Sequence, residues 1–461
     1  MKRFFTILFT ALLLTAALCV TASASDFDAV AEDLSAIGMF RGTANGFELD
    51  RAPTRSEAAI MLVRLYGAEE AAKTAYEAGE ISHPFTDVSE FTSPYVAWLY
   101  TNGITNGFTE TTYASQRACT AQNYVAFLLR ALGYKDGTDF QYADALTFAQ
   151  EKGFYDSLAF SGTFLRDDLA ALTYQGLAAD MADGKTYLLD SLIKSKAIDK
   201  TAAKPMTDKI EAYRAMQSAC ADMDSTMLDA DIDMKMDMTM SVAGETMTMP
   251  TEMTGNMKMI ADNLSNVQLA YELNTSLEGA ETTMGMWMKD GWQYLSMTVA
   301  GETTKIKSPV DDVTTALESL PVVDVDSMNV SGLAMIGSIT SKTVSNGTEY
   351  TMVFSENLGG SMDAVNELLG EAGTEASMDI SEIKAVYTVD RSGNLKKMTM
   401  VFSASMTMDM PLEDGSVVSM DLIYDYDLTM TIKAAGSRVK ITWPDFSDFQ
   451  EVSAEEFDSV A

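Results

Sequence analysis

Two arginines stand where a folded chain could hold a carboxylate. Arg55 and Arg166 each open an expected helix, directly after Thr54 and Leu165. A guanidinium offers a planar fork of N–H donors that fits a carboxylate, and the free backbone amides of a helix start favour an anion as well. The plainer alternative is that both are solvated arginines of a first turn. We treat Arg55 and Arg166 as candidate anion-binding residues.

Asp87 and four glycines lie in the loops that must position these arginines. Asp87 could contact a ligand, or it could cap the helix that follows, as short acidic side chains often do. Gly38, Gly42, Gly103 and Gly107 form two paired-glycine turns. We expect all four to adopt positive φ, which glycine tolerates, and such turns also let a ligand approach the backbone.

The sequence gives little support for catalysis. His83 is the single histidine, so a nucleophile would have one possible base, and a zinc site rich in histidine is excluded. No phosphate loop or dinucleotide fingerprint is present. Asp229, Asp231, Asp233 and Asp237 lack the glycine and terminal glutamate of a calcium loop, and we expect a solvated strand face. The protein is predicted not to be an enzyme and to need no cofactor or metal.

The arginines and glycines belong to a unit of helix, glycine loop and helix that occurs three times. The clearest copy is Pro84–Tyr134; Leu34–Tyr66 precedes it, and a shorter copy covers Ala143–Asp168. The first two copies superimpose at one constant offset, which we call the repeat offset, with these matches: Thr54 on Thr120, Leu62 on Leu128, Arg64 on Arg130 and Gly67 on Gly133. Three copies predict a single repeat array.

At these residues the chain resembles the S-layer homology (SLH) family. The resemblance rests on the Phe-x-Asp-Val sequence at Phe85–Val88, the paired-glycine turn and the Thr-Arg-Ser-Glu helix start at Thr54–Glu57. It covers roughly Asp26–Lys200. It implies an all-α, pseudo-threefold prism whose grooves hold a secondary cell-wall polysaccharide, often pyruvylated, and so tether the protein non-covalently to the wall. The residues it implies for polymer binding are Arg55, Arg166, Asp87, Phe91, Gly38, Gly42, Gly103 and Gly107.

The repeats depart from the family pattern in three places. Ala121 stands where the second repeat should carry the arginine, so this groove is expected to be inactive or differently built. Phe91 occupies a position where the family usually has tryptophan. The first repeat lacks a clean Phe-x-Asp-Val, and we interpret Phe27–Val30 as its remnant.

The first residues and the composition predict an exported protein. A positive start, an apolar stretch and a small-residue cleavage site make residues 1–24 a secretory signal peptide. No later stretch is apolar enough to span a bilayer, so no transmembrane segment is expected after cleavage. The formal net charge of −35 excludes nucleic acid and anionic membranes as favoured partners. Cys119 and Cys220 lie far apart, and no disulfide framework is visible.

Beyond a helix expected at Met206–Asp224, the hydrophobic period changes from four to two. Alternation of methionine with polar residues predicts half-buried strands, and dipeptides such as Asp290-Gly291 and Asn346-Gly347 predict hairpins. The expected strands are Ile232–Val242, Met253–Ile260, Val267–Leu277, Thr283–Met288, Trp292–Val299, Tyr350–Ser355, Ile383–Val389, Leu395–Met410, Val417–Ile432 and Arg438–Trp443. Short helices at Val310–Leu320 and Ser361–Leu369 would close a hollow side. This order resembles lipoprotein-carrier-like (LolA-like) half-barrels over Met206–Val452, an α+β domain with a strongly curved antiparallel sheet.

The methionines leave three interpretations open. Alternating methionine on a strand is most often core, and a flexible thioether surface also suits a hydrophobic ligand such as an acyl chain, an isoprenoid or an apolar peptide. A third interpretation is a Cu(I) site built from Met-x-Met pairs, as in Met284–Met288 or Met406–Met410.

Together these features predict a multidomain envelope protein. The expected divisions are a signal peptide at 1–24, three SLH repeats at 25–203 (about 25–70, 84–135 and 140–200), a Met-rich β domain at 206–452 and an acidic tail at 453–461. The repeats would anchor the protein at the cell wall or S-layer of a bacterium, and the β domain would bind a hydrophobic ligand. The alternative is a structural or self-assembling component in which the β domain is a spacer.

Overall fold

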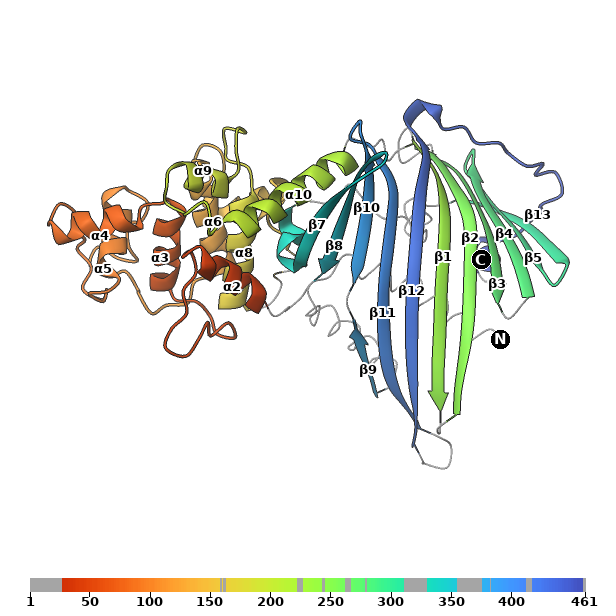
Figure 1. Ribbon diagram of the computed structural model, residues 1–461, viewed down its shortest axis with the longest axis horizontal. Helices are drawn as coiled ribbons and strands as arrows, with labels where there is room; N and C mark the ends of the chain where they lie inside the picture. Colours follow the sequence, from red (N-terminus) through yellow and green to blue (C-terminus); the bar gives the residue numbers. More distant parts are fainter. Residues whose placement is uncertain are drawn as a thin grey trace.

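The chain folds into a helical first part and a large antiparallel sheet (Figure 1). The computed structural model describes residues 27–157, 160, 163–221, 227–242, 245–261, 267–277, 280–310, 330–354, 375–381, 383–411 and 417–458. The signal peptide and the helices expected within 311–320 and 361–369 lie outside these residues.

Short helices separated by loops make up the first part. They are α2 (Asp28–Ala36), α3 (Arg55–Leu65), α4 (Glu69–Glu77), α5 (Ser93–Thr101), α6 (Ala121–Ala131), the 3₁₀ turn η1 (Tyr142–Asp144), α7 (Ala145–Glu151), α8 (Arg166–Ala178), α9 (Leu188–Lys194) and the longer α10 (Lys204–Ala221). The structure confirms the predicted helix, loop and helix order, and α4 is an additional helix that the pattern did not predict.

The repeat offset relates α3 to α6 from end to end. Thr54 and Thr120 are the N-caps of these helices, and each hydroxyl accepts the backbone N–H three residues on. Gly67 and Gly133 follow the last turns with φ of 66° and 96°. Each of these glycines donates to the carbonyl three residues back, which closes the helix in the manner of a Schellman motif.

One interpretation of the first repeat is wrong. Phe27–Val30 forms the start of α2, where Phe27 and Val30 are buried. Phe85–Val88, by contrast, lies in the loop that precedes α5. The two glycines Gly38 and Gly103 follow equivalent helices, so a true counterpart of Asp87 would fall before residue 27. The helical pattern of α2, and not a loop motif, explains why these apolar residues are present.

The helices pack around one apolar core. Contacts join α3 to α5 and α6, α6 to α8, and α8 to α2. Leu62, Leu128 and Leu172 are fully buried within it. The hydroxyls of Tyr124 on α6 and Thr173 on α8 form a buried hydrogen bond of 2.6 Å. Because the amphipathic faces all point inward, the loops between the helices are left at the surface.

The second part is a curved sheet of thirteen strands among the described residues. The strands are β1 (Met227–Val242), β2 (Glu245–Ala261), β3 (Val267–Leu277), β4 (Ala280–Lys289), β5 (Trp292–Val299), β6 (Glu302–Pro309), β7 (Ile336–Val344), β8 (Gly347–Phe354), β9 (Glu375–Ile380), β10 (Lys384–Asp390), β11 (Leu395–Pro411), β12 (Val417–Ala435) and β13 (Gln450–Glu451). Their order is β13-β6-β5-β4-β3-β2-β1-β12-β11-β10-β8-β7, with β9 beside β11. The two ends do not pair, so the curved sheet is unclosed (Figure 1).

Alternation along the strands separates two faces, as predicted. Met234, Met236 and Met238 are buried on one side, which we call the methionine face. Methionines lie opposite one another across β1 and β2, for example Met234 opposite Met253. Aspartates occupy the intervening positions, and Asp231 accepts hydrogen bonds from Lys433 and Asn256 at 2.9 Å each. Asp233 and Asp237 are exposed, which confirms the expected solvated face at these positions, whereas Asp229 and Asp231 are half-buried beside Asn256.

The last residues wrap around one edge of the sheet. Phe446 and Phe449 cover Trp287 and Tyr294 on the side opposite the methionine face. The chain then pairs with β6 through β13 and ends in the short helix α13 (Ala454–Asp458), whose Phe457 packs on the methionine face. We call residues 439–458 the C-terminal clasp.

Several strand predictions need correction. β3 and β5 match the predicted bounds, whereas β6, β7, β9 and β13 carry no clear alternation and were not predicted. The strand expected at Arg438–Trp443 is wrong: a 3₁₀ turn, η3 (Gly436–Arg438), is followed by irregular chain. Its apolar residues are present because the clasp packs on a sheet face, not because they pair in one.

Helix α10 and a 3₁₀ turn, η2 (Val330–Met335), join the two parts. Tyr213 and Met216 of α10 are buried, and the helix contacts β7 and β10. The amide of Ser331 donates to the Gly153 carbonyl at 3.0 Å, and the Gln175 side chain donates to the Ser331 carbonyl. The sheet is therefore packed against the helical part.

Candidate functional site

Asp87 organises the loop that follows α5. Its carboxylate accepts the backbone N–H groups of Tyr113 and Ala114 at 2.7 Å each and of Ser115 at 3.3 Å. Partial burial opposes ionisation, but the amides outweigh it and hold the pKa of Asp87 below its usual range. Asp87 therefore fixes a loop, and it does not cap α5, which has no side-chain cap.

Phe85 packs against the same loop. Its ring packs against Tyr100 and Tyr113, with centroids 5.4 and 5.7 Å apart. A side chain on Gly107 would come within 2.2 Å of this ring, and Gly107 has φ of 79°. The Phe-x-Asp-Val sequence thus positions the residues at 113–117, which we call the second loop.

Arg55, the first residue of α3, contacts the second loop. Its backbone N–H donates to the Arg117 carbonyl at 2.9 Å, and its Nε donates to the Tyr113 carbonyl at 3.0 Å. The guanidinium carbon stands 4.9 Å from the centre of the Tyr113 ring. These contacts fix the Cα and Nε of Arg55 and leave its two terminal nitrogens without a hydrogen-bond partner among the described residues.

Arg117 is the neighbour that the sequence analysis missed. It is exposed, and its guanidinium lies 4.9 Å from the ring centre of Phe108, itself 58% exposed. The repeat contained a signal for it, because the repeat offset places Arg117 on Arg51. The exposed arginine, the exposed ring and Arg55 form what we call the α3 junction, where α3 meets the second loop.

Most arginines of the helical part are already paired with carboxylates. In the described residues from 27 to 221 the ion-paired ones are Arg41, Arg51, Arg64, Arg130, Arg166 and Arg214. Arg55 and Arg117 make no ion pair there, although the chain carries a formal charge of −35. The α3 junction is therefore a cationic place in an acidic protein.

Arg166 is arranged like Arg55 but is buried. Its Nε donates to the Phe47 carbonyl at 2.8 Å, and its Nη1 donates to Glu57 at 2.7 Å. Only 3% of the residue is exposed, and its guanidinium stands 4.8 Å from the centre of the Phe40 ring. We call this contact of α8 with residues 47–51 the α8 junction.

The other predicted residues are dispersed. Phe91 is 72% exposed and touches Tyr95, with ring centres 6.3 Å apart. Gly38 and Gly103 have φ of 73° and 71°, as expected. Gly42 does not adopt positive φ, and this prediction is wrong: a side chain there would stand 2.9 Å from the Gly46 carbonyl oxygen, so the close approach of the backbone explains the glycine.

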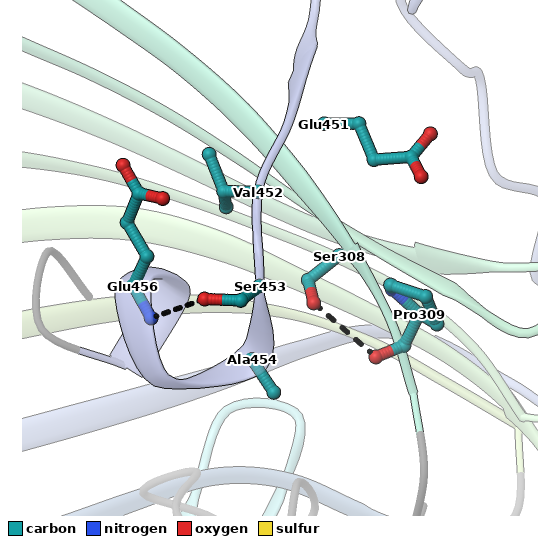
Figure 2. A pocket seen from close by; sticks show the side chains of 7 residues that line it. All are labelled: Ser308, Pro309, Glu451, Val452, Ser453, Ala454 and Glu456. Carbon is teal, nitrogen blue, oxygen red and sulfur yellow. Dashed lines mark hydrogen bonds between the residues drawn. The ribbon is translucent and has the colours of Figure 1, made fainter.

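A pocket at the edge of the sheet offers a weaker alternative. Figure 2 shows Ser308 and Pro309 of β6 facing the end of the clasp. Glu451 and Glu456 line it, and its lining includes no basic side chain. The bonds drawn are internal, from Ser308 to the Pro309 carbonyl and from the Glu456 amide to Ser453. We assign this pocket no function.

Comparison with known proteins identifies the segment around Asp87, which contains α5 and the loops on either side of it. The family model of the S-layer homology domain matches residues 84–120. The chain contains an S-layer homology domain. The match includes Asp87, Phe91, Gly103, Gly107 and the whole second loop, so SLH residues form one side of the α3 junction.

Two curated relatives share this region. The middle cell wall protein of Brevibacillus brevis is 31% identical over 114 residues, which is 24% of this chain and 10% of that protein. The surface layer protein of Brevibacillus choshinensis is 32% identical over 122 residues, which is 25% of this chain and 11% of that protein. The SLH domain and these relatives indicate a secreted protein of the cell surface. The chain spans about a tenth of either relative's length.

Solved structures resemble the sheet only loosely. A DUF1329 family protein from Desulfovibrio piger aligns with 50% of this chain and 95% of its own, at 10% identity and a TM-score of 0.15. The ywiB protein from Bacillus subtilis covers 43% and 94%, at 8% identity and a TM-score of 0.13. These scores are too low for any functional argument. No helix within the described ranges has the length and apolarity to cross a membrane.

Proposed function

We propose that this cell-surface protein is held at the bacterial wall by its SLH repeats, which bind an acidic wall polysaccharide at the α3 junction. The observation that carries the proposal is the pair Arg55 and Arg117, two arginines joined by a backbone hydrogen bond of 2.9 Å and without an ion pair in the described chain. Arginine forks bind carboxylates in a directed, charge-assisted way. The exposed ring of Phe108 beside Arg117 adds an apolar surface for a sugar ring.

We further propose that the three repeats form a pseudo-threefold prism. Its support is the recurrence of one set of contacts at two helix starts. At the α3 junction, the backbone N–H groups of Arg55 and Ser56 donate to the carbonyls of Arg117 and Ser115, and the Arg55 Nε donates to the Tyr113 carbonyl. At the α8 junction, the backbone N–H groups of Arg166 and Asp167 donate in the same way to the carbonyls of Arg51 and Leu49, and the Arg166 Nε donates to the Phe47 carbonyl. The helix start of the first repeat thus contacts the loop of the second repeat, and the helix start of the third repeat contacts the loop of the first.

The role proposed for the sheet is to present the methionine face to a hydrophobic partner. Met247 near the start of β2 is 45% exposed, whereas Met234 and Met238 are buried. Adaptable thioether side chains suit a partner of variable shape. The alternative role, a spacer or self-assembly module, predicts oligomers in light scattering, whereas a carrier stays monomeric and copurifies with an apolar species.

The test of wall binding is co-sedimentation of the mature full chain with sacculi of the producing bacterium. Wild-type protein should pellet with intact sacculi and stay in solution once the secondary polymer is stripped. The double variant Arg55→Gln/Arg117→Gln should lose about tenfold or more in affinity, because two charge-assisted contacts disappear.

Arg214→Gln is the matched control, since Arg214 lies on α10 and is paired with Asp180 at 2.6 Å. It should bind as the wild type does. Equal pelleting of the double variant, or no binding of wild type to intact sacculi, would overturn the proposed function. Arg166→Gln tests the sequence-based prediction that Arg166 contacts polymer; because Arg166 is buried and paired with Glu57 at 2.7 Å, we expect this variant to bind as the wild type does.

A further inference from the structure

The two arginine junctions differ in the carboxylates beside their arginines: Glu57 and Glu48 both pair with Arg51 at the α8 junction. The repeat offset places Asn123 and Ala114 at these positions of the α3 junction. At the α8 junction, Glu57 Oε1 accepts from Arg166 at 2.7 Å and from Arg51 at 2.6 Å. The same carboxylate holds the Thr54 amide at 2.7 Å through Oε2. Burial opposes ionisation of Glu57, yet these contacts lower its pKa. The α8 junction is thus neutralised from within.

The α3 junction carries the same two arginines without that carboxylate. The repeat offset places Arg117 on Arg51 and Asn123 on Glu57. Asn123 is the third residue of α6, as Glu57 is of α3, and its side-chain amide donates to the N-cap Thr120. An amide carries no charge, so Arg55 and Arg117 keep theirs unbalanced.

By sequence alone, the residues that correspond to this position at the start of α6 show the opposite imbalance. α6 begins with Ala121 in place of an arginine, and the sequence has Gly162 where Arg51 and Arg117 stand in the other repeats. The carboxylate position is filled by Asp168, which accepts the Leu165 amide at 2.6 Å. An acid without either arginine repels an anion. The arginine site is therefore neutralised at the α8 junction, cationic at the α3 junction and acidic at the start of α6.

We propose that Asn123 keeps the α3 junction open for one carboxylate of an acidic saccharide, and that Glu57 is an internal occupant of the equivalent place at the α8 junction. The ligand carboxylate then bridges Arg55 and Arg117 as Glu57 bridges Arg166 and Arg51. The chain binds a single carboxylate through its three repeats. This inference rests on the proposed wall binding and names the residue that selects the site.

The experiment is calorimetric titration of the mature full chain with the secondary polymer released from sacculi of the producing bacterium. Asn123→Glu supplies the missing carboxylate, so its affinity should fall by about tenfold or more, the worth of one charge-assisted contact. Asn123→Gln has the same length without the charge and should bind as the wild type does. Thermal unfolding checks each variant, and a glutamate is compatible with this helix position because it completes a capping box with Thr120.

The double variant Glu48→Gln/Glu57→Gln provides the reciprocal test, and its glutamine at 57 keeps an acceptor for the Thr54 amide. It removes both carboxylates that pair with Arg51 and the one that pairs with Arg166, so the number of binding sites per chain should rise from one to two. Wild-type affinity in Asn123→Glu, or an unchanged single site in the double variant, overturns the inference while leaving wall binding intact. Absence of binding by wild type overturns the proposed function itself.

Discussion

At the scale of one residue, Asp168 shows how the pKa of a carboxyl group responds to burial when no arginine is beside it. Burial raises its pKa to about 6, and the Leu165 amide offsets only part of this. Burial also opposes ionisation of Glu57, at the equivalent position, but its pKa is lowered because Arg51 and Arg166 are beside it. The two carboxylates occupy matching helix starts and differ in the cations around them.

The raised pKa of Asp168 predicts a pH effect on stability. Between about pH 4 and pH 6 the folded chain retains a proton that the unfolded chain has lost, so this residue's contribution to stability falls as pH rises through that window. Asp168→Asn keeps an acceptor for the Leu165 amide and removes the charge. The melting temperature of the variant minus that of wild type should therefore increase from pH 4 to pH 7, and remain level above about pH 7. A difference that does not change with pH would contradict this.

The sequence alone indicated part of this site and missed the rest for definite reasons. Arg55 and Asp87 were found because a helix start and a loop motif are local signals. Arg117 was available through the repeat offset, but its importance depends on Asn123, which becomes visible only when the Glu57 contacts are seen. That Arg166 is buried could not be predicted, because Phe40 and Phe47 reach it through tertiary packing.

At the scale of elements, the C-terminal clasp covers a sheet face that has no helix over it in the described chain. Phe446 stacks on Tyr294 with ring centres 3.9 Å apart, and Phe449 is buried against Trp287 at 6.2 Å. Lys305 reaches from β6 to Asp448 at 2.6 Å. These aromatic contacts bury apolar surface that helps to hold this irregular segment in place.

We expect Phe449→Ala to loosen the clasp. Removal of a buried ring costs about 3 to 5 kcal/mol in a well-packed site, so trypsin should cleave after the exposed Lys440 faster than in wild type. Phe91→Ala, at an exposed ring, is the control and should leave this cleavage rate unchanged. Equal rates for wild type and Phe449→Ala would show that the clasp is held by other contacts.

Element-level prediction succeeded where one face of an element is apolar. The period of two gave β3 and β5 their bounds and separated methionines from aspartates. It failed for Arg438–Trp443, because clasp residues and strand residues both bury alternate apolar side chains. Sheet order was also beyond reach, since β1 pairs with β12 and no local pattern records a partner so far along the chain.

At the scale of the whole molecule, the net negative charge of the chain disfavours its approach to the proposed acidic partner. A chain with a formal charge of −35 and an acidic polymer repel at long range, whereas the α3 junction is the place proposed to attract the polymer at contact. Raising ionic strength from about 0.01 to 0.15 M shortens the Debye length from about 30 to about 8 Å. The association rate with immobilised polymer should therefore increase over this range. A rate that falls as salt is added would mean that a wider cationic surface guides binding.

The pairing of β1 with β12 also sets an order of events during export. A chain that emerges from its amino end can assemble the helical repeats first, because the residues that join the repeats, such as Arg166 and Phe47, all precede β1. The central pair β1 and β12 forms only after residue 435 has appeared, and the clasp only after residue 458. Until then β1 and β2 expose a methionine-rich surface, and such late, non-local pairing is slow and prone to aggregation. We therefore expect secretion of this protein to depend on folding factors outside the membrane. The sheet, and not the helical repeats, would create this dependence.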